Sequence, residues 1–65
     1  MKQAKEIYSR NTIFQAVSDY GNIAKIVVSE DDKYWILEFS ECVADEDITK
    51  MEFENYLIGL ENAYL

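Results

Sequence analysis

The chain has no histidine, no proline, two glycines, one cysteine and no long apolar run. Without histidine it lacks the usual general base of an enzyme and a common zinc ligand, and the lone thiol of Cys42 cannot close an intrachain disulfide. No stretch approaches the roughly 20 apolar residues of a membrane span, and residues 1–10 lack the apolar core of a signal peptide. We therefore expect a cytoplasmic protein with no metal, no other cofactor and no membrane contact.

Basic residues are also scarce, since six lysines and arginines stand against thirteen acidic residues. The resulting net charge of −7 and pI near 4.3 oppose binding to nucleic acid, because phosphate groups repel such a surface. Hydrophobic residues make up 49% of the 65-residue chain, which favours a folded domain over disorder. A chain this short buries only about 60% of its unfolded surface. We therefore expect a protein or peptide partner, or a homo-oligomer, because binding stabilises the native state.

Few residues in the sequence mark a break between structural elements. There are no repeats and no low-complexity tracts, and Gly21 and Gly59 are too isolated to mark a linker. Residues 1–65 are therefore predicted to form one domain. Residues 4–8 are predicted to form a short edge strand at its beginning.

Residues 10–20 carry the signals of a helix. Ser9 or Asn11 can cap its first free N–H groups. Gly21 follows the last apolar position and is expected to take the left-handed conformation that ends a helix. The face expected to enter the core has the spacing i, i+3, i+4, i+7. Its members are Ile13, Ala16, Val17 and Tyr20.

Residues 24–39 alternate in two runs around Asp31 and Asp32, as a β-hairpin does. With these aspartates as a two-residue turn, one face is wholly apolar and the other sets opposite charges across the strands. The apolar face, predicted to be core, has the pairs Val28–Trp35, Ile26–Leu37 and Ala24–Phe39. The other has Ser29–Tyr34, Val27–Ile36 and Lys25–Glu38. A longer loop stays open as an alternative, because Asp-Asp is a weaker turn signal than Asn-Gly.

Residues 45–65 have the longest helical pattern. Asp45, Glu46 and Asp47 gather where the helix dipole favours acids and where an aspartate can cap the start. The predicted apolar stripe comprises Phe53, Tyr56, Leu57, Leu60 and Tyr64, opposite Lys50, Glu54 and Glu61. Both helices are expected to cover the apolar sheet face. The predicted fold is an α+β two-layer sandwich in the order strand, helix, strand, strand, helix.

No catalytic motif is recognisable. Cys42 has no imidazole to activate it. The acids at residues 45–47 lack the glycine and the closing glutamate of an EF-hand, and they fit a helix start better than a calcium site. Glycine-rich phosphate loops and nucleophile elbows do not occur. We expect that the chain is not an enzyme, and at most an accessory subunit of one.

The sheet offers two surfaces for a partner. Its outer face is predicted to display four candidate residues, Lys25, Val27, Tyr34 and Ile36. Apolar residues scattered on a solvated sheet are ordinary, so this face is either plain surface or a docking patch. An open sheet edge can also accept an extended peptide through main-chain hydrogen bonds.

The C-terminal helix offers a third surface. Met51, Ile58 and Leu65 are spaced by seven residues and form a possible seam beside the core stripe. The simpler interpretation is that Met51 and Ile58 widen the core stripe, because coiled coils need several heptads. Together, the candidate surfaces carry more apolar area than a core of this size easily uses.

A resemblance sharpens the hypothesis. The segment IYSRNTIFQAVSDY runs from a strand residue into a capped helix ending in an aromatic residue, the strand pair follows, and the chain closes with EFENYLIGLENAYL. Over residues 7–65 this pattern resembles the HxsD-like family, small proteins encoded beside radical-SAM peptide-modifying enzymes. The closing segment looks like that family's acidic-phenylalanine-asparagine-leucine helix. The resemblance implies an accessory protein that binds a precursor peptide or its modifying enzyme, and it transfers no individual functional residue.

Our leading hypothesis is a non-catalytic module for protein or peptide binding. Its candidate partner-binding residues are Lys25, Val27, Tyr34, Ile36, Met51 and Ile58. Two alternatives stay open. One is a small acidic inhibitor or nucleic-acid mimic of the phage type, suggested by the charge of −7. The other is a structural homodimer that uses the seam of Met51, Ile58 and Leu65.

Overall fold

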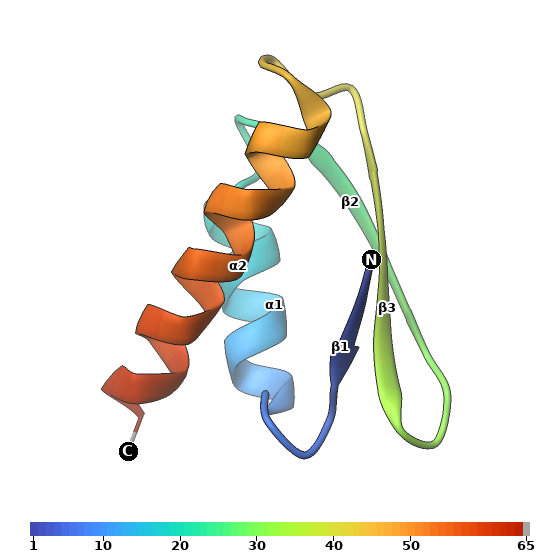
Figure 1. Ribbon diagram of the computed structural model, residues 1–65, viewed down its shortest axis with the longest axis vertical. Coiled ribbons are helices and arrows are strands. Elements are labelled where there is room, and N and C mark those ends of the chain that lie inside the picture. Colours follow the sequence, from blue (N-terminus) through green and yellow to red (C-terminus); the bar gives the residue numbers. More distant parts are fainter. Residues whose placement is uncertain (65) are drawn as a thin grey trace.

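Three strands and two helices make up the computed structural model, which describes residues 1–64 (Figure 1). In chain order they are β1 (Lys2–Ala4), α1 (Arg10–Asp19), β2 (Lys25–Glu30), β3 (Tyr34–Ser40) and α2 (Glu46–Ala63). The strands form one antiparallel sheet in the order β1-β3-β2, and both helices lie on one side of it (Figure 1). The predicted α+β order and its two layers are confirmed.

The first strand begins earlier and ends sooner than predicted. It comprises Lys2–Ala4 and pairs with β3, whereas residues 4–8 were expected. The carbonyl of Ala4 accepts hydrogen bonds from the N–H groups of Ile7 (3.1 Å) and Tyr8 (3.0 Å), so the chain turns directly after Ala4. This turn brings the Tyr8 side chain into the core, where it is buried.

Helix α1 begins where predicted and ends at Asp19, one residue sooner than predicted. The Ser9 hydroxyl accepts the N–H of Thr12 (3.3 Å), which makes Ser9 the N-cap. The prediction for Gly21 is wrong, because neither glycine has a positive φ. The helix ends instead in a right-handed turn in which the Gly21 N–H donates to the Ser18 carbonyl (3.1 Å). The left-handed residue is Glu41 (φ 50°), between β3 and α2.

The hairpin faces are as predicted, but the register is shifted by two residues. Asp31 Oδ1 accepts the N–H groups of Lys33 (2.8 Å) and Tyr34 (2.7 Å), and the Asp31 N–H donates to the Tyr34 carbonyl (3.0 Å). The tip is therefore Asp32–Lys33. A shift of two keeps every side chain on its face and changes its partner. The observed pairs are Ile26–Phe39, Val28–Leu37 and Glu30–Trp35 on the inner face, and Lys25–Ser40, Val27–Glu38 and Ser29–Ile36 on the outer face.

The core lies between the inner sheet face and the helices. Trp35 and Leu37 are buried and Phe39 is half-buried, as predicted. The Phe53 ring on α2 meets the rings of Tyr20 (5.0 Å between centroids) and Phe39 (5.3 Å) edge to face. Such contacts contribute beyond their buried area. The core cluster is Tyr8, Ile13, Ala16, Tyr20, Trp35, Leu37, Phe53 and Leu57.

The start of α2 is confirmed and its core stripe is confirmed in part. Asp45 caps the helix by accepting the Ile48 N–H (3.0 Å). Phe53 and Leu57 are buried and Leu60 is half-buried, as predicted, but Tyr56 and Tyr64 are exposed.

Two charged residues of α2 do not lie opposite the core as expected. Glu61 accepts the Ser9 N–H (2.8 Å) and the Thr12 hydroxyl (2.8 Å), and so ties α2 to the start of α1. Lys50 pairs with Glu46 (3.0 Å), and its Nζ lies 5.9 Å from the Phe39 ring centroid. The long aliphatic stems of such side chains can cover apolar surface while their charged ends reach water.

Candidate functional site

The outer face is the side of the sheet turned away from both helices (Figure 1). It brings together four of the six predicted partner-binding residues, Lys25, Val27, Tyr34 and Ile36. Val27 is 53% exposed and Tyr34 is 39% exposed, while Ile36 is half-buried. The remaining two, Met51 and Ile58, lie on α2 and are not part of this face.

The register divides the apolar residues of the outer face. Val27 lies opposite Glu38, and Ile36 lies opposite Ser29 on one side and Lys2 on the other. Val27 and Ile36 are therefore diagonal neighbours rather than the predicted direct pair, which places them farther apart. The outer face is therefore a mixed surface on which the apolar residues lie among polar and charged ones.

The two edges of the sheet differ in what they leave open. On β1, the outward main-chain groups belong to Lys2 and Ala4, and the Ala4 carbonyl is already occupied by Ile7 and Tyr8. Strand β2 is twice as long, with six residues against three. The longer edge therefore offers a more extended row of main-chain groups.

The turn decides which groups of β2 are open. Bonded and non-bonded positions alternate along an antiparallel pair, and Asp31 bonds to Tyr34. Ser29, Val27 and Lys25 therefore direct their main-chain groups to β3, and the residues between them direct theirs outward. These are Ile26, Val28 and Glu30, and no main-chain group elsewhere in residues 1–64 bonds to them. We call this row the β2 edge.

Both ends of the β2 edge have distinct surroundings. At its start lies a depression of about 370 Å³. Its lining combines apolar residues with polar and charged ones: Val17, Ile23, Ile26, Asn22, Lys25 and Glu41. At its end, Glu30 accepts hydrogen bonds from Lys5 Nζ (2.7 Å) and Arg10 (3.2 Å). The bond from Lys5, assisted by the charge of Arg10, lowers the pKa of the Glu30 carboxyl. One end is thus a hollow of mixed polarity, and the other is an ion-pair cluster.

The ion-pair cluster also covers the core. Lys5 Nζ lies 4.8 Å from the Trp35 ring centroid, and the Arg10 guanidinium carbon lies 5.0 Å from it. Trp35 Nε1 donates to the Tyr8 carbonyl (2.9 Å). These contacts hold the loop after β1 and the start of α1 over the sheet, so they have a structural role.

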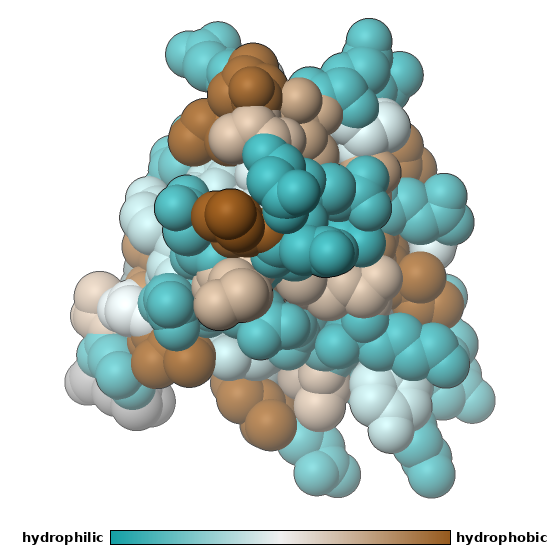
Figure 2. All heavy atoms as spheres, turned by 45° about the horizontal axis from the view of Figure 1, so that its top comes forward, coloured by the Kyte–Doolittle hydropathy of each residue, from teal (hydrophilic) through white to brown (hydrophobic). Residues whose placement is uncertain are grey.

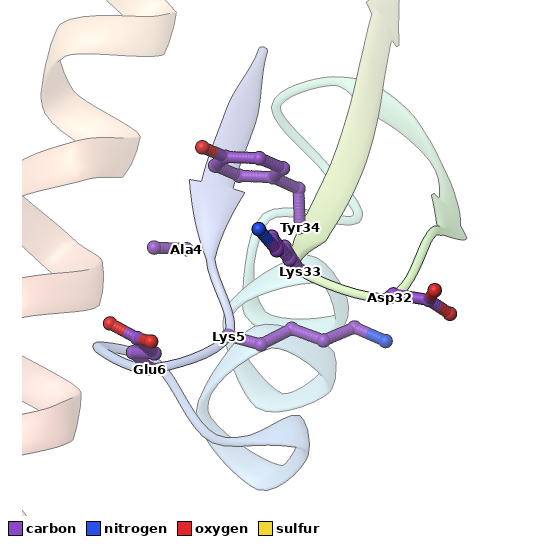
Figure 3. Close-up of a pocket in the computed structure, with 6 residues that line it drawn as sticks. All are labelled: Ala4, Lys5, Glu6, Asp32, Lys33 and Tyr34. Carbon is purple, nitrogen blue, oxygen red and sulfur yellow. The ribbon is translucent and has the colours of Figure 1, made fainter.

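A smaller pocket of about 200 Å³ lies between the end of β1 and the hairpin tip (Figure 3). Figure 3 shows Lys5 and Glu6 pointing to opposite sides of the chain, while the Tyr34 ring extends from β3 toward β1. Small-molecule sites commonly have volumes of about 300–1,000 Å³ and convergent polar groups. This pocket has neither feature, and we assign it no ligand.

Residues 1–64 form neither a metal-type cluster nor a membrane-spanning helix. No three cysteine, aspartate or glutamate side chains there come together as a metal site would require. Neither helix in that range is both long and apolar enough to cross a membrane.

Sequence reasoning named the open edge only in general terms and missed Ile26, Val28 and Glu30. The missing information was the turn, because its position fixes the alternation of bonded residues along β2. The preference of an aspartate to bond the N–H two residues ahead is the signal that could have placed the turn.

Comparisons with protein-family models, with curated proteins and with solved structures found no match for this chain. The resemblance to the HxsD-like family therefore stays a prediction from the residue pattern.

Proposed function

We propose that this chain is a non-catalytic binding module that takes up an extended segment of a protein or peptide along the β2 edge. The observation that supports it best is the row of open main-chain groups on Ile26, Val28 and Glu30. An extended segment can add to such an edge as a fourth strand and pair its own main chain there. Edge strands are commonly protected by proline, charged side chains or covering loops. Strand β2 has no proline, and its two charged residues, Lys25 and Glu30, stand at its two ends.

Side chains beside the β2 edge can select the segment. In an added strand, alternate side chains point to opposite faces of the sheet. Those on the outer side would contact Val27 and Lys25, both exposed. Those on the inner side near the start of β2 would reach the depression beside Val17 and Ile23. A preferred segment would thus carry an apolar side chain on its inner face near the start of β2, and on its outer face an acidic group beside Lys25 and an apolar one beside Val27.

The chemistry of the partner follows from the proposal. A precursor peptide of a modifying enzyme, which the family resemblance implies, would present itself as an extended chain. The module would then act as an accessory that holds such a peptide, while an enzyme supplies the catalytic groups.

Backbone N-methylation tests the proposal, because the 65-residue chain is short enough for chemical synthesis. Peptides are first selected from a random library with the unmodified protein. A methyl group on the Val28 nitrogen removes an outward donor and leaves the bonds to β3 intact. Loss of one edge hydrogen bond and the added steric clash should lower the affinity for the selected peptides by about tenfold or more.

The matched control carries its methyl group on the Lys2 nitrogen, an outward position of β1. It should bind the selected peptides like the unmodified protein. Equal binding by the protein methylated at Val28, with a native circular dichroism spectrum, would show that the β2 edge is not the binding site.

A further inference from the structure

Helix α2 has a second ordered face besides the one in the core. Residues spaced alternately by three and four, as at the a and d positions of a heptad, form a row along the helix. We call this row the α2 seam. It comprises Ile48, Met51, Asn55, Ile58 and Asn62, and Leu65 would follow but lies outside the described residues.

The α2 seam points away from the core. A helix turns by about 100° per residue, which places Met51 and Ile58 on the side opposite Phe53 and Leu57. Met51 is 65% exposed, Ile58 is 49% exposed and Ile48 is 55% exposed. The expectation that Met51 and Ile58 widen the core stripe is therefore wrong. The apolar seam residues have no cover within residues 1–64.

The positions beside the α2 seam are acidic. In heptad terms, Asp47 and Glu54 occupy g positions and Glu52 occupies an e position, and all three are exposed. The lysine of α2, Lys50, lies off this face and pairs with Glu46. Figure 2, with the end that carries the start of α2 turned toward the viewer, shows apolar patches separated by strongly polar ones. In coiled coils, charges at e and g choose the partner.

This charge pattern opposes a second copy of the chain as the occupant and favours a basic partner. Two copies joined along the α2 seam would place Asp47, Glu52 and Glu54 of one beside the same acids of the other, in either orientation, and like charges repel. We propose that the α2 seam binds an amphipathic helix of a partner protein, with apolar residues at a and d and lysine or arginine at e and g. The partner pairs its basic flanks with the acidic flanks of α2.

A short seam suffices here because α2 is already folded. Isolated coiled coils need several heptads partly because the helices themselves must form. Helix α2 is held by Phe53 and Leu57 in the core, so binding does not have to order it. Asn55 and Asn62 lie at a positions, where a buried asparagine fixes the alignment and number of helices at some cost in affinity. Affinity should accordingly be moderate and the register defined.

The test uses two synthetic helical peptides of about three heptads, with isoleucine and leucine at a and d and one asparagine at a. One peptide has lysine at every e and g position, and the other has glutamate there. Titration calorimetry with the intact protein should show binding of the lysine peptide, at least about tenfold tighter than the glutamate peptide. No binding of the lysine peptide would overturn the proposal.

Protein variants locate the binding. Replacing both apolar residues, Met51→Ser with Ile58→Ser, should lower the affinity for the lysine peptide by about tenfold or more. The exposed apolar contacts are removed and the core is left intact. Glu52→Lys with Glu54→Lys should reverse the preference toward the glutamate peptide. The matched control, Val27→Thr with Ile36→Thr on the outer face, should bind the lysine peptide unchanged.

Two further outcomes would overturn the inference. Binding that is lost in the Glu52, Glu54 variant but unchanged in the Met51, Ile58 variant would mean charge attraction alone, as for an acidic mimic. A dimer in sedimentation equilibrium that the Met51, Ile58 variant dissociates would make a second copy the occupant. The methylated Val28 protein should bind the lysine peptide normally, so failure here leaves the proposal for the β2 edge intact.

Discussion

The two faces of the sheet both carry large apolar side chains, but only one face is buried. Trp35 and Leu37 are 4% and 0% exposed, whereas their neighbours Tyr34 and Ile36 lie on the outer face and reach water. Hydrophobicity of a residue therefore does not decide its burial here. The alternation of the strand assigns each side chain to a face, and the helices bury the face that has more apolar residues. The outer face leaves Val27 and Tyr34 in contact with water.

The largest effect should come from a core residue of the inner face. Leu37→Ala should destabilise the protein by about 2–5 kcal/mol, because a cavity opens under both helices. That loss is comparable with the roughly 3–5 kcal/mol that a core of this size supplies, so most of the chain should unfold. Far-ultraviolet circular dichroism with urea titration measures it. Ile36→Ala on the outer face is the control and should stay folded; equal losses would contradict the distinction between the faces.

A smaller effect is expected where the inner face meets the loop after β1. Trp35→Phe removes the hydrogen bond from Nε1 to the Tyr8 carbonyl and leaves that buried acceptor unpaired. It should cost about 1–3 kcal/mol. The urea midpoint should fall, and Tyr34→Phe on the outer face should leave it nearly unchanged. An unchanged midpoint for Trp35→Phe would show that the bond to Tyr8 does not stabilise the fold.

The helix layer that covers the inner face can be loosened by acid. Hydrogen bonds from the Ser9 N–H and the Thr12 hydroxyl lower the pKa of the Glu61 carboxyl below its ordinary 4.5. A carboxyl whose pKa is lower in the folded state than in the unfolded state stabilises the fold at pH values above its unfolded pKa. This contribution is lost as the pH falls through the folded-state pKa. Glu61→Gln should therefore lower the thermal midpoint at pH 7, with a difference that shrinks toward pH 3. A difference independent of pH would contradict a role for the charge of Glu61.

The smallest effect is expected on the outer face. Val27→Thr keeps the β-branched shape that suits a strand, and Val27 is 53% exposed. The free energy of unfolding should change by no more than about 0.5 kcal/mol. Urea titration checks this, and a loss above 1.5 kcal/mol (roughly, the range of a core substitution) would show that Val27 supports the fold.

Local patterns in the sequence predicted much of this fold for physical reasons. Ser9 and Asp45 cap the two helices through their own side chains, which need only the next few residues. The alternation in β2 and β3 predicted the inner face because neighbouring strand side chains always point to opposite sides. The predicted position of the turn was wrong because two successive aspartates allow two registers. The observed register depends on which aspartate accepts the N–H groups ahead of it.

Elsewhere the prediction failed where packing decides. Gly21 was expected to be left-handed, but the chain after α1 continues into a right-handed turn and Glu41 takes the left-handed conformation instead. Periodicity places Tyr56 with Phe53 on one face of α2. Both rings contact Tyr20 at the end of α1, but only Phe53 also packs against Phe39 of the sheet. For the same reason, the seven-residue spacing of Met51 and Ile58 could not tell a wider core from a free seam.

The sequence alone determined the element types, their caps and the faces to which strand side chains point, because each depends on residues a few positions apart. It also determined the acidic charge, which is a sum over the residues. Tertiary structure decided which strand edge stays open, how far each helix reaches over the sheet and which apolar rows remain in water. Those outcomes depend on contacts between segments distant in the chain, and local spacing does not encode the distances between them.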